Sequence, residues 1–191
     1  MRLARPSLPR LCLLLLIVVP ALAWAVVRPV RVLAPGLAPV SCANGICVDV
    51  PERAPEAVRL VQDSRSFVVA RVGSLPEGAT MIFCATQRCA DHFGLGLRSA
   101  VTLGSAGTVI GPRAWKPYYV RHELIHQAQA RHIGVVRLLW TPAWIVEGMA
   151  YGLSDDPRAP LSEPFESQRR RFLAWYAGIP PGTLWTALRD R

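Results

Sequence analysis

Two histidines and one glutamate near the middle of the chain have the types and spacing of a catalytic metal site. The five residues run His122-Glu123-Leu124-Ile125-His126. Residues four apart share a face of an α-helix, so the imidazoles of His122 and His126 can bind one ion. Glu123 then projects beside that ion, where a carboxylate can activate a metal-bound water. The alternative interpretation is a helix with two surface histidines and a solvated glutamate.

A second acidic residue lies in an apolar segment further along the chain. Residues 141–151 read TPAWIVEGMAY, and Glu147 is their only charged residue. Pro142 is typical of a helix start, so we expect a buried helix over 143–152. Burying an unpaired carboxylate is unfavourable, so either a metal ion or an arginine must satisfy Glu147. A catalytic zinc takes three protein ligands, and Glu147 is the candidate for the third.

The two segments together resemble the gluzincin metallopeptidases, the thermolysin-like family. The resemblance covers residues 118–156 and rests on His-Glu-x-x-His followed by Trp-x-x-Glu-Gly-x-Ala, with residues 127–146 between His126 and Glu147. It implies that His122, His126 and Glu147 bind one zinc ion per chain and that Glu123 is the general base. It also implies hydrolysis of a peptide or protein substrate in a zincin-like domain.

The chain departs from the family pattern at the position four residues after Glu147. Many members carry an aspartate there, which orients a ligating histidine, whereas this chain has Tyr151, with Asp155 and Asp156 a turn further on. We therefore expect Tyr151 either to donate to the oxyanion or to hydrogen-bond one of the ligand histidines. Other residues that could stabilise the oxyanion are Tyr118, Tyr119, His92 and His132.

The first 27 residues have the charge and hydropathy of an export segment. Arg2, Arg5 and Arg10 precede an apolar run over 11–27, and no acid occurs in this part of the chain. Small residues near the end of the run suit signal-peptide cleavage, but the run is also long enough for a short membrane span. The segment is therefore a signal peptide or a membrane anchor, with a slight preference for the anchor. Both predict an exported domain on the periplasmic side of the membrane.

The cysteines are consistent with export. Cys42 and Cys47 form one pair and Cys84 and Cys89 another, each pair enclosing four residues. In an oxidising compartment this arrangement predicts two local disulfides. A second, structural zinc is the alternative, although the C-x₂-C spacing of such sites is absent. Cys12 lies in the apolar run and is interpreted as one more apolar residue.

The net charge of +9 does not by itself indicate a nucleic-acid partner. Lys116 is the only lysine, while arginine, alanine, proline and glycine are abundant, which is a compositional bias. The densest basic run, 169–171, has no interleaved aromatic residues that would stack on bases. We therefore expect no nucleic acid as partner, and a solvated helix face or contact with anionic lipid headgroups instead.

The remaining pattern predicts one α+β domain in which a small sheet precedes the active-site helices. Residues 28–40, with three prolines, are expected to form a semi-extended linker to a domain over 41–191. The expected strands are 66–72, 80–85, 101–103 and 108–110, the last two as a hairpin, with 58–61 as strand or short helix. The expected helices are 117–131, 143–152 and 163–177, with a helical turn over 86–92 and a loop or short helix over 135–140.

The function that this sequence favours is a zinc-dependent peptidase in which a metal-activated water attacks the peptide bond. Glu123 would accept the proton and pass it to the leaving amine. The alternative is a non-catalytic, zinc-stabilised binding domain at the cell envelope. A purely structural zinc site has no use for a carboxylate at Glu123, which favours catalysis.

Overall fold

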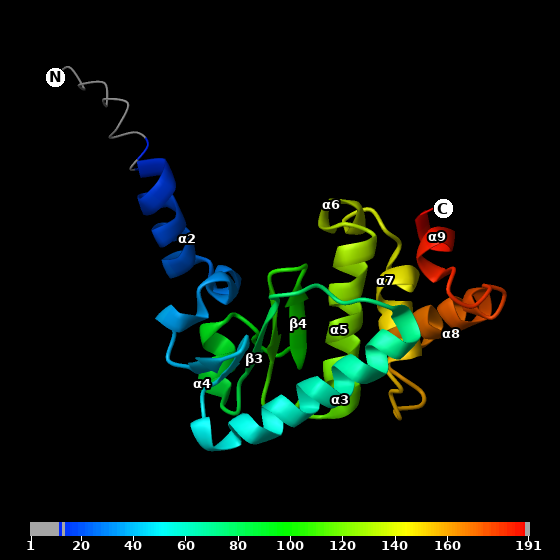
Figure 1. Ribbon diagram of the computed structural model, residues 1–191, viewed down its shortest axis with the longest axis horizontal. Coiled ribbons are helices and arrows are strands. Elements are labelled where there is room, and N and C mark those ends of the chain that lie inside the picture. The colour runs from blue at the N-terminus through cyan, green and yellow to red at the C-terminus, as the bar shows by residue number, and fades with distance from the viewer. Residues whose placement is uncertain (1–11, 13, 190–191) are drawn as a thin grey trace.

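The computed structural model describes residue 12 and residues 14–189, and it has an α+β fold, as predicted (Figure 1). Within this part of the chain, five strands form one mixed sheet of order β1-β2-β3-β5-β4. The strands are β1 (Ser41–Ala43), β2 (Ile46–Val48), β3 (Thr80–Phe83), β4 (Ala100–Leu103) and β5 (Gly107–Ile110). β2, β3 and β5 run parallel, while β1 and β4 pair antiparallel at the two edges.

Side chains alternate between two cores on opposite faces of the sheet, as a strand period of two requires. In β3, Met81 and Phe83 join the larger core, whereas Ile82 joins the smaller one. Helices α3 (Ala54–Val72) and α5 (Pro117–His132) cover the larger core. The short helix α4 (Gln87–His92) and the 3₁₀ segment η2 (Arg28–Leu33) cover the smaller core.

Both predicted disulfides are present, Cys42–Cys47 and Cys84–Cys89, with Cα–Cα distances of 4.0 Å and 5.3 Å. The first joins directly opposite residues of the β1–β2 hairpin, whose turn contains Asn44 and Gly45, both at positive φ. An Asn-Gly pair is favoured in such turns because both residues tolerate this conformation. The two disulfides indicate an oxidising, extracytoplasmic environment.

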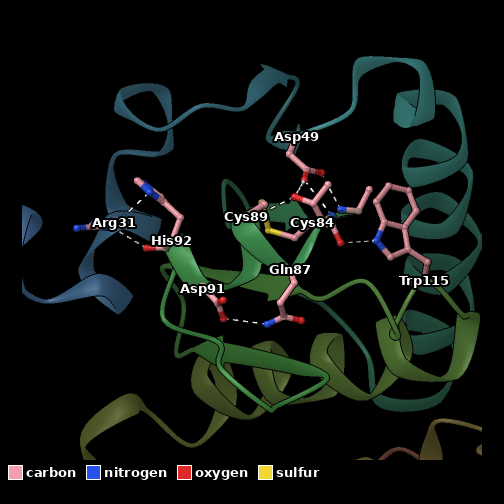
Figure 2. The surroundings of a disulfide bond; sticks show 10 residues. Arg31, Asp49, Cys84, Gln87, Cys89, Asp91, His92 and Trp115 are labelled. Atoms are coloured by element: carbon pink, nitrogen blue, oxygen red, sulfur yellow. Dashed lines mark hydrogen bonds between the residues drawn. A yellow bond between two sulfur atoms is a disulfide. The ribbon is translucent and has the colours of Figure 1, made fainter.

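The second disulfide lies in a tightly bonded turn after β3 (Figure 2). The carboxylate of Asp49 accepts hydrogen bonds from the backbone N–H of Ala85, at 2.6 Å, and of Thr86, at 3.0 Å. The indole N–H of Trp115 donates to the carbonyl of Cys84 at 2.9 Å. These bonds fix the end of β3 against the segment that leads into α5.

The predicted strand over 66–72 is wrong, because these residues form the last turns of α3. The buried residues of α3 are spaced by three or four, namely Ala57, Val61, Ser64, Val68 and Val72. This spacing gives one apolar face on a helix, and over 19 residues it outweighs the β-propensity of the valines. Residues 58–61, for which either a strand or a short helix was expected, belong to the same helix.

The other predicted elements agree with the structure within a few residues. The strand over 80–85 is β3, the hairpin is β4–β5, and the helical turn is α4. The helices over 117–131, 143–152 and 163–177 are α5, α7 (Ala143–Leu153) and α8 (Phe165–Tyr176). The connector over 135–140 contains the short helix α6 (Val135–Leu138), and α9 (Leu184–Arg189) ends the described chain.

The segment over 28–40 is not the semi-extended linker that its prolines suggested. It forms η2 and a second 3₁₀ turn, η3 (Pro35–Leu37), and Val32 is buried in the smaller core. A Cβ built on Gly107 of β5 would lie 2.7 Å from Val32, so the segment packs closely on the sheet. The segment is therefore part of the packed structure.

An apolar helix, α2 (Val19–Val26), and the π-helical turn η1 (Leu14–Val18) precede this segment and stand away from the sheet (Figure 1). The basic residues expected to start the export segment lie in 1–11, outside the described residues. No helix in the described part of the chain combines the length and the apolar character needed to cross a membrane.

Candidate metal centre

Helix α5 presents the two motif histidines on its side toward α7. Leu124, Ile125 and Ala128 of the same helix are fully buried and hold it against the core. Helix α7 packs on α5 and on α8, and it places Glu147 opposite the histidines. Packing against α5 and α8 therefore fixes the position of α7, the helix that carries Glu147.

The three predicted ligands converge. The Nε2 atoms of His122 and His126 are 3.1 Å apart, and the Glu147 carboxylate lies 3.5 Å from the first and 3.7 Å from the second. Ligands at 2.0–2.2 Å from a tetrahedral zinc are about 3.3–3.6 Å from one another. The separations in the protein are close to this range, and two imidazoles with one carboxylate suit zinc. The group can thus hold a metal ion.

Glu147 faces the histidines and not an arginine. Among the ion pairs of the described residues, its partners are His122 and His126. Burial raises the pKa of Glu147, but the hydrogen bond from His122 and the charges of both histidines outweigh burial and leave the pKa below its usual value. The carboxylate is therefore ionised at neutral pH, as a metal ligand must be.

Gln129, for which the sequence carried no signal, orients one of the predicted ligands. Its Oε1 lies 2.8 Å from Nδ1 of His126, and its Nε2 donates to the carbonyl of Val146 at 2.9 Å. Because Oε1 can only accept, Nδ1 of His126 carries a hydrogen, so Nε2, on the side of Glu147 and His122, is the nitrogen that can bind a metal. Gln129 thus sets the ligating tautomer and ties α5 to α7 beside Glu147.

Glu123 is buried beside the cluster and is held by an edge strand. Its Oε2 accepts a hydrogen bond of 2.7 Å from the hydroxyl of Thr102 in β4. That hydroxyl is 2.7 Å from the hydroxyl of Thr108 in β5, which accepts from Nε2 of Gln127 at 3.0 Å. A chain of donors therefore runs from Gln127 through both threonines to the carboxylate.

The charge state of Glu123 is shifted by the same surroundings. Burial raises the pKa of the carboxyl group, although the charge of His126 and the hydrogen bond from Thr102 act in the opposite direction. A carboxylate whose pKa is raised is a stronger base than an ordinary carboxylate, which suits the abstraction of a proton from water.

These residues line one cleft of about 560 Å³ between β4 and the helices. His122, Glu123, His126 and Glu147 all line it. β4 lies along one wall through residues 100–102, and it pairs only with β5 in the described sheet. Tyr119, Tyr151 and Arg158 also line the cleft.

Tyr151 lines the cleft with its ring against a ligand. The centroids of the Tyr151 and His122 rings are 4.3 Å apart in an edge-on arrangement. Burial and the charge of Glu147 raise the pKa of Tyr151 to about 12, so its hydroxyl stays protonated at neutral pH. No hydrogen bond of the described residues links this hydroxyl to either ligand histidine.

Of the other residues considered for the oxyanion, only Tyr119 lines the cleft. Its hydroxyl accepts from Nη1 of Arg158 at 3.0 Å, and Arg158 is paired with the buried carboxylate of Asp156. Tyr118 contacts Tyr119 without lining the cleft, with ring centroids 4.7 Å apart.

The remaining histidines are used elsewhere in the molecule. The ring of His132 stacks on Trp185 at 4.3 Å. His92 lies on the other face of the sheet, where its carbonyl accepts from Arg31 (Figure 2). Arg158, in contrast, was not selected from the sequence, since its place in the cleft depends on long-range packing.

Comparisons with protein-family models, with curated proteins and with solved structures found no match to this chain. The functional assignment therefore rests on the site geometry and on the residues that build it.

Proposed function

We propose that this protein is a zinc-dependent peptidase of the gluzincin type. The observation that carries the proposal is the convergence of His122, His126 and Glu147 beside the buried Glu123, in a cleft that runs along an edge strand. When bound, zinc supplies a Lewis acid that polarises a peptide carbonyl and increases the acidity of water.

Glu123 carries out the proton transfers in this proposal. Its carboxylate takes a proton from the attacking water and then gives it to the leaving amine. Thr102 holds the carboxylate in one orientation during both transfers, through its 2.7 Å hydrogen bond. Positioning of this kind contributes to rate because the transfer needs donor and acceptor in hydrogen-bond contact.

The walls of the cleft suit an extended peptide. The outer edge of β4 offers backbone groups that can pair with a substrate strand, a common way of binding peptides. Tyr151, protonated at neutral pH, is placed to donate a hydrogen bond to the developing oxyanion. The hydroxyl of Tyr119 and the guanidinium of Arg158 add further donors in the same cleft.

We further propose that the domain acts on the periplasmic side of the membrane, with the N-terminal apolar segment retained as an anchor. The two disulfides support export. The exposed apolar side chains of α2 support contact with lipid.

The first prediction tests catalysis through Glu123→Gln in the full chain. We expect the wild type and this variant each to bind one zinc per chain, and peptide hydrolysis to fall by about 10²–10⁴-fold in the variant. Metal analysis and mass spectrometry of a digested peptide mixture measure the two quantities. Glu77→Gln, at an exposed glutamate, is the matched control and should retain full activity.

Two results would contradict the proposal in different ways. If Glu147→Gln bound zinc as tightly as the wild type, the ligand set would be wrong. If zinc bound normally but the wild type hydrolysed no peptide, the non-catalytic, zinc-stabilised binding domain would replace the peptidase.

A further inference from the structure

Large apolar side chains that are exposed gather in two segments of the described chain. One is the N-terminal segment over 15–37, which includes α2. The other comprises Val135, Val136, Leu139 and Trp140, exposed by 49 %, 69 %, 75 % and 74 %, and we name these four residues the α6 patch. Elsewhere in the described chain only Val69, Leu97 and Leu173 are of this kind. Such clustering marks an interaction surface, whereas single exposed apolar residues do not.

The surroundings of the α6 patch are basic. No acidic residue occurs between Glu123 and Glu147, while Arg131 precedes the patch in sequence and Arg137 lies within it. Nη2 of Arg137 donates to the carbonyl of Arg189 at 2.8 Å, which brings the basic end of α9 beside α6. Apolar residues with a tryptophan and a rim of arginines are typical of a surface that enters an anionic lipid interface.

The α6 patch and the apolar helix α2 lie toward the same side of the molecule. In Figure 1, α6 and α9 form the upper limit of the folded body, and α2 rises on that side from the region of α4. Arg31 holds α2 in this direction, because its Nε donates to the carbonyl of Trp24 at 3.1 Å and its Nη1 to that of His92 at 2.8 Å. A flat membrane surface across the top of this view would therefore contact both apolar segments.

We infer that the α6 patch is a membrane-docking surface that enters the interfacial layer of an anionic bilayer. Val136, Leu139 and Trp140 contact the acyl chains, while Arg137 and Arg189 contact lipid phosphates. A protein partner or a second copy would not account for the basic rim together with the shared direction of α2. Lipid contact at two separate points fixes the orientation of the domain on the membrane.

This orientation places the cleft close to the lipid. α6 joins α5 to α7, and Leu138 of α6 lines the cleft. The β4–β5 turn also reaches α6, since a Cβ built on Gly104 would lie 3.0 Å from Val135. As a consequence that rests on the proposed function, the accessible substrates are peptide segments near the bilayer surface.

The test measures the depth of a nitroxide label at position 139 in the full chain. Leu139→Cys is made in a Cys12→Ser background, labelled, and reconstituted in vesicles of phosphatidylethanolamine and phosphatidylglycerol. Electron paramagnetic resonance then compares collisions with oxygen, which concentrates in lipid, and with a nickel chelate, which stays in water. Leu97→Cys is the control, because Leu97 is exposed and precedes the end of β4 that is remote from α6.

We expect the ratio of oxygen to nickel collisions to be several-fold higher at position 139 than at position 97. Arg137→Gln should reduce this ratio in the anionic vesicles. An aqueous label at position 139 would overturn the inference, and so would a label shielded from both reagents, which indicates a protein contact. None of these measurements depends on peptide hydrolysis. A negative result would therefore refute membrane docking of the α6 patch without contradicting the proposed function.

Discussion

Thr102 and Glu123 show how a single hydroxyl can orient a buried carboxylate. A glutamate side chain has several accessible rotamers, and burial alone does not select among them. Thr102 selects one, and its own hydroxyl is kept in place by Thr108 and Gln127, both fully buried. The orientation of Glu123 is therefore a property of two strands and a helix together.

The second prediction concerns Thr102→Val, which removes the hydroxyl at nearly constant volume. We expect kcat to fall by about 10–100-fold while KM and zinc content stay near the wild-type values, because Glu123 loses its orienting donor. Steady-state kinetics and metal analysis measure the effect. Thr102→Ser keeps the hydroxyl and should retain most of the rate; a valine variant as active as the serine variant would show that the hydrogen bond has no catalytic role.

The third prediction concerns Tyr151→Phe. Since the Tyr151 hydroxyl is protonated at neutral pH and Tyr151 lines the cleft, we expect turnover to fall by about 10²–10³-fold with zinc affinity unchanged. Zinc titration and kinetics separate the two quantities. Tyr118→Phe, outside the cleft lining, is the control. Weaker zinc binding in Tyr151→Phe would instead mean that the hydroxyl supports a ligand histidine.

At the scale of elements, the position of Glu147 depends on how closely α8 approaches α7. A Cβ built on Gly148 would collide with the backbone carbonyl of Gln168, and it would lie 2.9 Å from Cβ of Phe172. Glycine at 148 therefore permits the contact that holds the ligand helix in place. The close contact with α8 therefore explains why a glycine follows Glu147.

The fourth prediction is that Gly148→Ala lowers the free energy of unfolding by about 1–3 kcal/mol, because α8 must move away from α7. Chemical denaturation measures this change. Gly152→Ala is the matched control in the same helix, since its added Cβ would meet only side chains of Phe172 and Leu173, at 3.1 Å and 3.2 Å. Equal stability of the two alanine variants would contradict the packing argument.

At the scale of the whole molecule, one disulfide lies within the sheet and the other connects the sheet to a flanking helix. Cys42–Cys47 closes the hairpin at one edge, and Cys84–Cys89 joins the end of β3 to α4. Both close short loops, so each restricts the unfolded chain only modestly.

The fifth prediction is that removing either disulfide by a double Cys→Ser change lowers the free energy of unfolding by about 2 kcal/mol, from the entropy of a loop of this length. Thermal unfolding of the two variants measures it. Mass spectrometry of the native full chain should find Cys12 as its only free thiol. Four free thiols at the paired positions would contradict export to an oxidising compartment.

What the sequence by itself determined was local. The spacing of His122 and His126 predicted a shared helix face, Pro142 predicted the start of the ligand helix, and two cysteine pairs predicted two short-range disulfides. Each of these depends on residues a few positions apart, where helix geometry and loop length decide the outcome. The α+β class followed from the same local patterns, even though the last turns of α3 were mistaken for a strand.

Only the tertiary structure decided which distant residues meet at the site. Thr102 reaches Glu123 because β4 forms the sheet edge beside α5, and Gln129 reaches Val146 because α7 packs on α5. Arg158 enters the cleft through the same packing. Such contacts join segments that are far apart in the sequence, and no periodic pattern in the sequence predicts them. They form only when the two cores pack and each buried polar group is paired with a hydrogen-bond partner.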